Sequence, residues 1–335
     1  MPSVTLVAAL VGAVWAFPTL VAAQRDPIIP DSVLISIPEK WIRLVGRESL
    51  RESRTIVVPT VLHYLSVDGA MRSTSAAVRG NATVTIEYTV VGLEKTVVEE
   101  MAQGVEMDFI ARLRRQGLTV LGYADIESNP LVARMERRAV DTTYGTPIVR
   151  NDASRTTYAV VAPTGRQLFP ADPRRPALGF LALAKELNAI VIVPELWVNA
   201  PRLARARMQI PGRLAAGMNA DPGLDMHQAS VAFVTPSGAM GSISLNEALA
   251  TLSADAGALN LAHADSFATG VSSNVATMQA LDRAGMIGLA RARGAARNKS
   301  RNDQLDFVVA PRAYHLAVLV GAASFFQVAA AQIAR

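Results

Sequence analysis

Residues 82–93 read ATVTIEYTVVGL, and the alternation of their side chains decides much of the fold. Apolar residues occupy every second position, and mostly threonine or glutamate stands between them. This period of two predicts a strand with one buried and one solvent-exposed face. From Glu94 the period changes, because apolar residues then recur every three or four positions up to Leu113. The change predicts an amphipathic helix that ends before Gly117.

The same order of helix and strand recurs further along the chain. Residues 177–187 carry an apolar stripe at helical spacing, and residues 189–193 form a continuous apolar run that is typical of a strand covered on both faces. Further strands are predicted at residues 33–37, 55–67, 158–162, 230–235 and 242–245. We therefore predict an α/β or α+β fold with a mixed sheet of about six to eight strands flanked by helices.

The chain becomes rich in alanine after residue 245. Helices are predicted at residues 246–252, 274–293 and 314–333. The last helix is apolar on nearly every side, which is typical of a helix buried in a fold or an oligomer interface, or of one that contacts a membrane. The predicted organisation is a signal peptide at residues 1–23, an α/β domain at residues 24–245 and an Ala-rich helical section at residues 246–335.

The first twenty or so residues differ from the rest. Residues 4–23 form an apolar run without a charged side chain, which indicates a secretory signal or a membrane anchor. Pro18 would kink a spanning helix, and the small residues before Gln24 resemble a cleavage site, so we expect cleavage after Ala23. The predicted location is the periplasm or the exterior of a bacterial cell, with an uncleaved anchor as the alternative.

The composition excludes several classes of protein. The 335 residues are 50% hydrophobic and 18% charged, with a net charge of +5, which is typical of a folded chain rather than a disordered one. The chain has no cysteine, so disulfides, thiolate metal sites, iron–sulfur clusters, cysteine nucleophiles and a lipidated cysteine are all excluded. No cofactor is expected.

The sequence contains none of the common catalytic motifs, such as the nucleophile elbow, the P-loop or the zinc-binding HExxH. Histidine and aspartate do occur at mirrored spacing in two places, and their oxygen and nitrogen atoms are suitable metal ligands. These residues are Asp225, His227, His263 and Asp265. Polar surface is the competing interpretation, so metal-assisted or carboxylate hydrolysis in the periplasm is the alternative function.

A basic segment lies near the end of the predicted second Ala-rich helix. Its cations are Arg291, Arg293, Arg297, Lys299 and Arg301, and a second basic group is formed by Arg202, Arg205, Arg207 and Arg213. Such clusters bind an acidic protein partner or anionic lipid headgroups, or simply remain in solvent. Nucleic acid is disfavoured because no aromatic residue is interleaved for base stacking.

Three stretches resemble one family of small α/β domains, which is used by the curli secretion channel and by periplasmic lipoprotein activators of cell-wall synthases. They are residues 109–120, 181–193 and 231–244. The resemblance implies an accessory role in the bacterial envelope. The chain departs from that family because it lacks the lipidated cysteine and has a longer Ala-rich tail.

The leading prediction is a secreted bacterial envelope protein with a non-enzymatic binding or assembly role. Its expected partners are other envelope proteins, further copies of itself or an anionic lipid surface, and not nucleic acid. A periplasmic carrier of an apolar ligand is a third interpretation.

Overall fold

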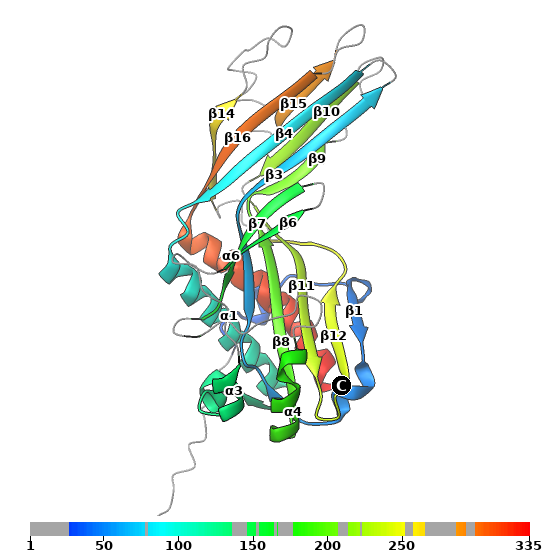
Figure 1. The fold of residues 1–335 in the computed structure, drawn as a ribbon, viewed down its shortest axis with the longest axis vertical. Coiled ribbons are helices and arrows are strands. Elements are labelled where there is room, and N and C mark those ends of the chain that lie inside the picture. Colours follow the sequence, from blue (N-terminus) through cyan, green and yellow to red (C-terminus); the bar gives the residue numbers. More distant parts are fainter. Residues whose placement is uncertain are drawn as a thin grey trace, which may run out of the picture.

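The computed structural model describes residues 27–77, 80–135, 146–151, 154–163, 166, 177–206, 214–221, 223–251, 257–264, 286–292 and 299–335. Within these residues the chain forms a thirteen-stranded sheet, a second sheet of three strands, and helices (Figure 1). The predicted α/β class is confirmed, and the main sheet has more strands than expected. The predicted signal peptide lies outside the described residues.

The elements have the following bounds. The strands of the large sheet are β1 (Ile42–Val45), β2 (Thr55–Val57), β3 (Leu62–Ala77), β4 (Gly80–Val91), β5 (Thr119–Leu121), β6 (Thr146–Asn151), β7 (Ser154–Val161), β8 (Ile190–Asn199), β11 (Leu224–Val234), β12 (Met240–Leu245), β13 (Leu249–Thr251), β14 (Gly257–Ala264) and β16 (Lys299–Val309). The second sheet contains β9 (Arg202–Ala206), β10 (Leu214–Asp221) and β15 (Met286–Ala292). The helices are α1 (Lys95–Arg115), α2 (Tyr123–Ile126), α3 (Pro130–Arg134), α4 (Leu181–Leu187) and α6 (Pro311–Ala334), with 3-10 turns at Asp31–Val33, Glu39–Trp41, Arg47–Arg51 and Leu178–Phe180.

The large sheet is mixed, as predicted. Its main path runs β1, β12, β11, β8, β3, β4, β16, β14. The pairs β2 with β5, β2 with β8, β3 with β8 and β4 with β16 are parallel, and the other pairs are antiparallel. The parallel pairing of β16 with β4 joins segments more than two hundred residues apart in the sequence.

The sequence periods predict the central elements correctly. Val84, Ile86, Tyr88 and Val90 of β4 are buried, and the helix expected after them is α1, which ends before Gly117 at a positive φ of 78°. A positive φ favours glycine, which explains why the helix stops there. Strand β8 is buried on both faces along nearly its whole length, as its continuous apolar run predicts.

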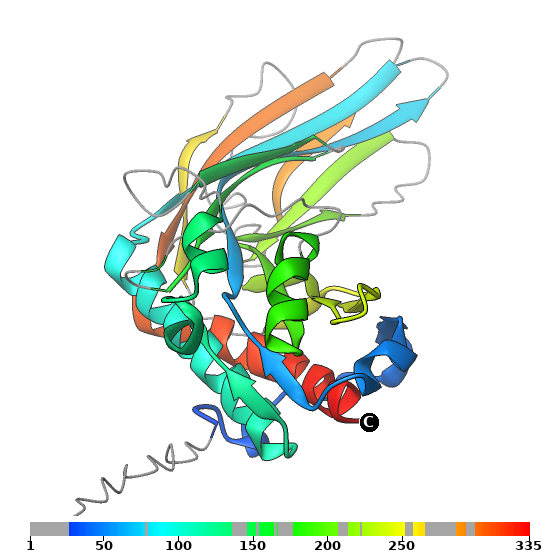
Figure 2. The ribbon, with the colours of Figure 1, turned by 60° about the horizontal axis from the view of Figure 1, so that its bottom comes forward.

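The lower part of the molecule, which we call the body, covers both faces of the sheet with helices (Figure 2). Helices α1 and α6 cover one face, and the shorter α4 and its neighbours cover the other. Strand β3 shows the alternation directly, because Leu65 lies in the first apolar core whereas Leu62 and Tyr64 lie in the second. The body is therefore a helix, sheet and helix sandwich.

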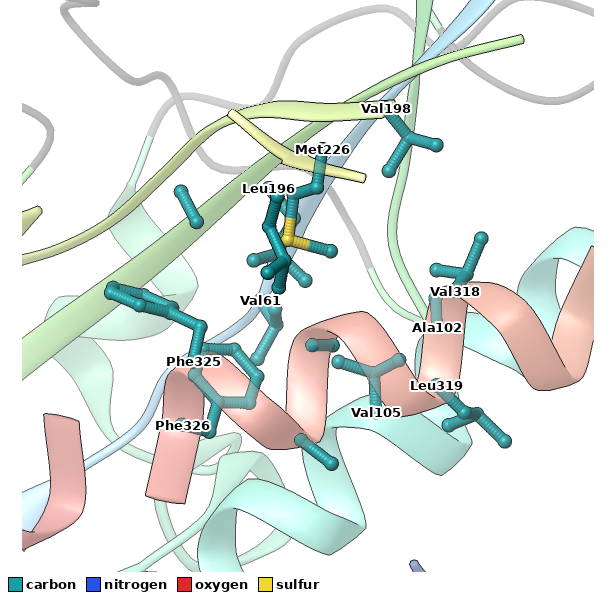
Figure 3. Packing of buried hydrophobic residues seen from close by; sticks show 14 of the residues in the cluster. Val61, Ala102, Val105, Leu196, Val198, Met226, Val318, Leu319, Phe325 and Phe326 are labelled. Carbon is teal, nitrogen blue, oxygen red and sulfur yellow. The ribbon is translucent and has the colours of Figure 1, made fainter. Parts of the chain in front are cut away.

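Helix α6 is long and apolar enough to span a membrane, yet 67% of its most apolar stretch is buried within the structure. Phe326 stacks on Phe109 of α1 with ring centroids 4.2 Å apart, and Phe325 and Val318 also lie in the core (Figure 3). Gly104 of α1 lets the two helices approach, since a Cβ there would lie 3.4 Å from Leu319. This burial favours the interpretation of α6 as a core helix.

The long strands β3, β4 and β16 continue past the helices and form an arm at the other end of the molecule (Figure 1). There the three-stranded sheet β9, β10, β15 contacts β3, β4 and β16. Val84 and Ile86 of β4 are buried in the same core as Met218 and Ala220 of β10. The arm is thus a two-layer β structure whose core is continuous with that of the body.

Three sequence predictions are wrong. Residues 33–37 form no strand, because Leu34, Ile35 and Ile37 instead pack against the apolar core beside the helices. The expected helices at residues 246–252 and 274–293 contain β13 and β15 in their described parts. Alanine has the highest intrinsic helix propensity, but intrinsic propensity is small compared with tertiary interactions, and pairing with β11 and β10 outweighs it. Residues after 245 also add β14 and β16 to the large sheet, so only α6 is helical among the described residues of the predicted Ala-rich section.

Candidate functional site

Charge is distributed unevenly along the arm. Its outer part, which we call the distal arm, comprises the described residues 69–77, 80–86, 203–206, 214–220, 286–292 and 299–302. These residues include five Lys and Arg and no Asp or Glu, although the whole chain has a net charge of only +5. The rest of the chain therefore has no net charge. The sequence read as separate segments does not show this segregation, because three distant stretches combine to produce it.

The strand pairing places five cations in the described part of the distal arm. They are Arg72 of β3, Arg205 of β9, Arg291 of β15, and Lys299 and Arg301 of β16. Four of them lie within three residues of a strand end that points away from the body, and the side chain of Arg72 is exposed. The structure thus brings part of both predicted basic groups to one end of the molecule. Arg293 and Arg297 lie outside the described residues.

Acidic residues begin where the distal arm meets the body. Glu87 pairs in register with Ala70, and Asp303 pairs with Ile86. On the second sheet Asp221 pairs with Arg202. These carboxylates follow a line across the arm, so the change of charge occurs at the same level in both layers.

A small cleft lies at the base of the arm. It has a volume of about 330 Å3, part of it open to solvent, and is lined by Ala70, Met71, Tyr88, Thr156, Asn199, Pro201, Arg202, Leu203 and Asp225. Burial raises the pKa of Tyr88 above its usual value. A Cβ at Gly69 would lie 2.6 Å from the ring of Tyr88, so this glycine makes room for the ring. The lining offers hydrogen-bonding groups with a single carboxylate and no histidine.

The metal-site candidates lie on different parts of the sheet. Asp225 lies in β11 and lines the cleft, and His227 follows it at an irregularity of the same strand. His263 lies in β14, and β8, β3, β4 and β16 stand between β11 and β14 in the sheet order. Asp265 lies outside the described residues. Among the described residues, no group of three or more His, Asp or Glu side chains is arranged to hold a metal ion.

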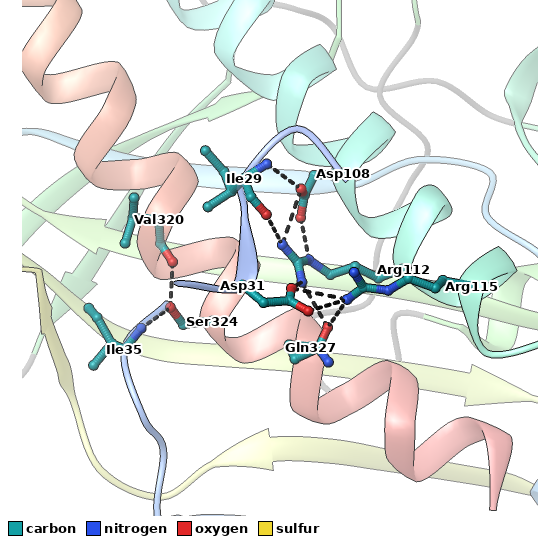
Figure 4. A network of polar contacts seen from close by, with 9 residues as sticks. All are labelled: Ile29, Asp31, Ile35, Asp108, Arg112, Arg115, Val320, Ser324 and Gln327. Atoms are coloured by element: carbon teal, nitrogen blue, oxygen red, sulfur yellow. Dashed lines mark hydrogen bonds and ion pairs between the residues drawn. The ribbon is translucent and has the colours of Figure 1, made fainter. Parts of the chain in front are cut away.

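The body holds a polar network that sequence reasoning missed (Figure 4). Arg112 of α1 is fully buried, and its Nε donates to Asp108 Oδ2 at 2.6 Å. Its Nη2 donates to the Ile29 carbonyl at 2.7 Å, and its Nη1 donates to Asp31 Oδ1 at 2.9 Å and to Gln327 Oε1 of α6 at 2.7 Å. One guanidinium therefore joins α1, α6 and the N-terminal strap, which we define as residues 27–37.

The strap has two further attachments. The Ile29 amide donates to Asp108 Oδ1 at 3.0 Å, and the Ile35 amide donates to Ser324 Oγ of α6 at 2.9 Å. Hydrogen bonds from Arg115 and Arg112 hold the pKa of Asp31 below its usual value. The only sequence signal for this network was the spacing of four between an aspartate and an arginine on a predicted helix.

Other titratable side chains are also buried in the body, among them His63 and Glu106. His63 of β3 has no exposed surface, and neither of its ring nitrogens has a hydrogen-bond partner among the described residues. Burial lowers its pKa to about 3. Burial also raises the pKa of Glu106, although Arg166 forms an ion pair with it.

No family model matches this chain, and no match exists among the curated proteins or the solved structures.

Proposed function

We propose that the chain is a secreted bacterial envelope protein with a non-enzymatic binding or assembly role, and that the distal arm is its contacting element. The observation that supports this proposal is the segregation of charge, which leaves the distal arm without a carboxylate. Like charges gathered at one end of a molecule attract anionic partners over long range. The resemblance to envelope accessory domains stays a prediction that agrees with this role.

Fractionation of the cell envelope tests the proposal. The arm variant carries Arg72→Gln, Arg205→Gln, Arg291→Gln, Lys299→Gln and Arg301→Gln. The body control removes five exposed cations elsewhere, through Lys40→Gln, Arg43→Gln, Arg47→Gln, Arg134→Gln and Lys185→Gln. Both variants have the same net charge, so a difference between them reports the position of the charge.

We expect the unchanged protein and the body control to stay with the envelope fraction, and the arm variant to be released into the soluble fraction. Size-exclusion chromatography with light scattering then distinguishes self-association from binding to another component. A protein that is soluble and strictly monomeric, with no retained partner, would contradict the proposal.

A further inference from the structure

The five described cations of the distal arm come from four strands in two layers. Arg72, Lys299 and Arg301 belong to the large sheet, and Arg205 and Arg291 belong to the three-stranded sheet that covers it. No single strand or sheet face carries the set. A partner that contacts all of them must therefore meet the end of the arm and extend past both layers.

The kinds of side chain narrow the chemistry of that partner. Four of the five described cations in the distal arm are arginines, whose planar guanidinium binds phosphate or carboxylate through two hydrogen bonds at once. The same stretches contain no Phe, Trp, Tyr or His. Protein interfaces usually depend on a few central aromatic anchors, so the distal arm is poorly equipped for a compact protein interface.

Electrostatics favours an extended anionic surface. The nine residues of β3 beyond Asp68 span roughly 30 Å, and Arg291 and Lys299 lie near the outer strand ends. Arg72 and Arg301 lie two residues from the level of Glu87 and Asp303. Repulsion among like charges disfavours the free arm, and an anionic surface relieves it. Anionic membranes attract each such cation with about 1 kcal/mol.

Resting on the proposed function, we propose that the distal arm binds the phosphate groups of an anionic phospholipid surface, end on. The alternative is that these cations only protect exposed strand edges from pairing with other chains, as charged residues commonly do. The two interpretations differ in whether anionic lipid binds the protein.

Vesicle flotation tests the proposal. The protein is residues 24–335, which include every described element and leave out the apolar run at residues 4–23. The vesicles contain phosphatidylcholine alone, or phosphatidylcholine with about 30% phosphatidylglycerol to supply a negative surface potential. We expect flotation only with the anionic vesicles, and we expect it to weaken steeply as the Debye length shortens with added salt.

The two variants described above locate the binding. Each cation contributes about a fivefold gain in partitioning, so the arm variant should bind on the order of 10³-fold more weakly. The body control should stay close to the unchanged protein. Circular dichroism verifies that both variants fold. If the arm variant does not fold, the salt dependence of flotation of the unchanged protein still tests the proposal.

Inorganic phosphate distinguishes a surface from a discrete anion site. At constant ionic strength, phosphate in large excess over protein should leave flotation unchanged, because single phosphates cannot replace a multivalent surface. Displacement by phosphate would overturn the proposal in favour of a soluble ligand. Equal binding to neutral and anionic vesicles, or equal losses in both variants, would overturn it as well.

The outcome for the lipid is separable from the outcome for the proposed function. Suppose that the unchanged protein does not bind anionic vesicles and that, of the two variants, only the arm variant leaves the envelope fraction. The lipid proposal then fails, and the contacting role of the arm is retained. If the protein never associates with the envelope fraction, the proposed function itself fails.

Discussion

Charged side chains are arranged differently in the body and in the distal arm. In the body, Arg112 is buried completely and is matched by Asp108, Asp31 and acceptors on two other elements. Among the described residues of the distal arm there are five cations and no acidic residue. Paired charges fix the geometry of a core, whereas charges of one sign are useful only toward something outside the fold. We therefore propose that the body provides stability and that the arm provides recognition.

Truncation in the core of the body should have the largest effect on stability. Phe326→Ala removes a ring that stacks on Phe109 and is fully buried, so we expect the free energy of unfolding to fall by about 3–5 kcal/mol. Leu316→Ala on the same helix is the control, because its side chain is 56% exposed and the change should cost under about 0.5 kcal/mol. Urea denaturation measures both. Equal costs would mean that α6 is not a core helix.

Loss of the buried guanidinium should lower the free energy of unfolding somewhat less than Phe326→Ala does, because methionine in Arg112→Met keeps much of the apolar volume. It leaves Asp108 buried without its cation, and we expect a loss of about 3 kcal/mol. Arg115→Met is the matched control, because that side chain is 38% exposed and shares Asp31 and Gln327; it should cost under about 1 kcal/mol. If both variants lose the same stability, Arg112 does not fasten the strap.

The buried histidine should make the body sensitive to acid. The pKa of His63 is about 3 in the folded chain against an ordinary value of 6.5, so the unfolded chain takes up the proton first. The free energy of unfolding is therefore unaffected above about pH 6.5 and falls as the pH drops toward 3, by about 3 kcal/mol near pH 4. His63→Leu should flatten this part of the stability profile. An unchanged pH slope in that variant would contradict the assignment.

The arm charges should matter least for stability. In the arm variant we expect the free energy of unfolding to change by less than about 1 kcal/mol, with a small gain at low salt because repulsion is relieved. Thermal unfolding at low and high salt measures this against the body control. A large loss would show that the cations hold the arm together rather than serve a partner.

Local sequence periods predict the body and strand β4 well, and the other strands of the arm poorly. The periods of β4, α1 and β8 follow from which of their faces are buried, and these elements lie where the periods place them. Strand β15 is rich in small and aliphatic residues without a period of two, so only its pairing with β10 makes it a strand. The strap resembles a strand in composition, but its apolar residues are used against helices.

The candidate site was half visible in the sequence. The basic segment that ends at Arg301 was evident, but its meaning depends on the parallel pairing of β16 with β4 and on the second sheet packing against both. Those pairings are long-range and leave no local signal. The same applies to Arg112, whose partners Ile29 and Gln327 are far from it in the sequence.

Photo-crosslinking in intact cells tests the central claim most directly. A photoreactive phenylalanine analogue replaces Ser300, which is exposed at the distal end of β16, or Ala182, which is exposed on α4 in the body. We expect adducts to lipid or to another envelope component at position 300 and none at position 182. Adducts at position 182 with none at position 300 would contradict the account, because the contacting surface would then lie on the body.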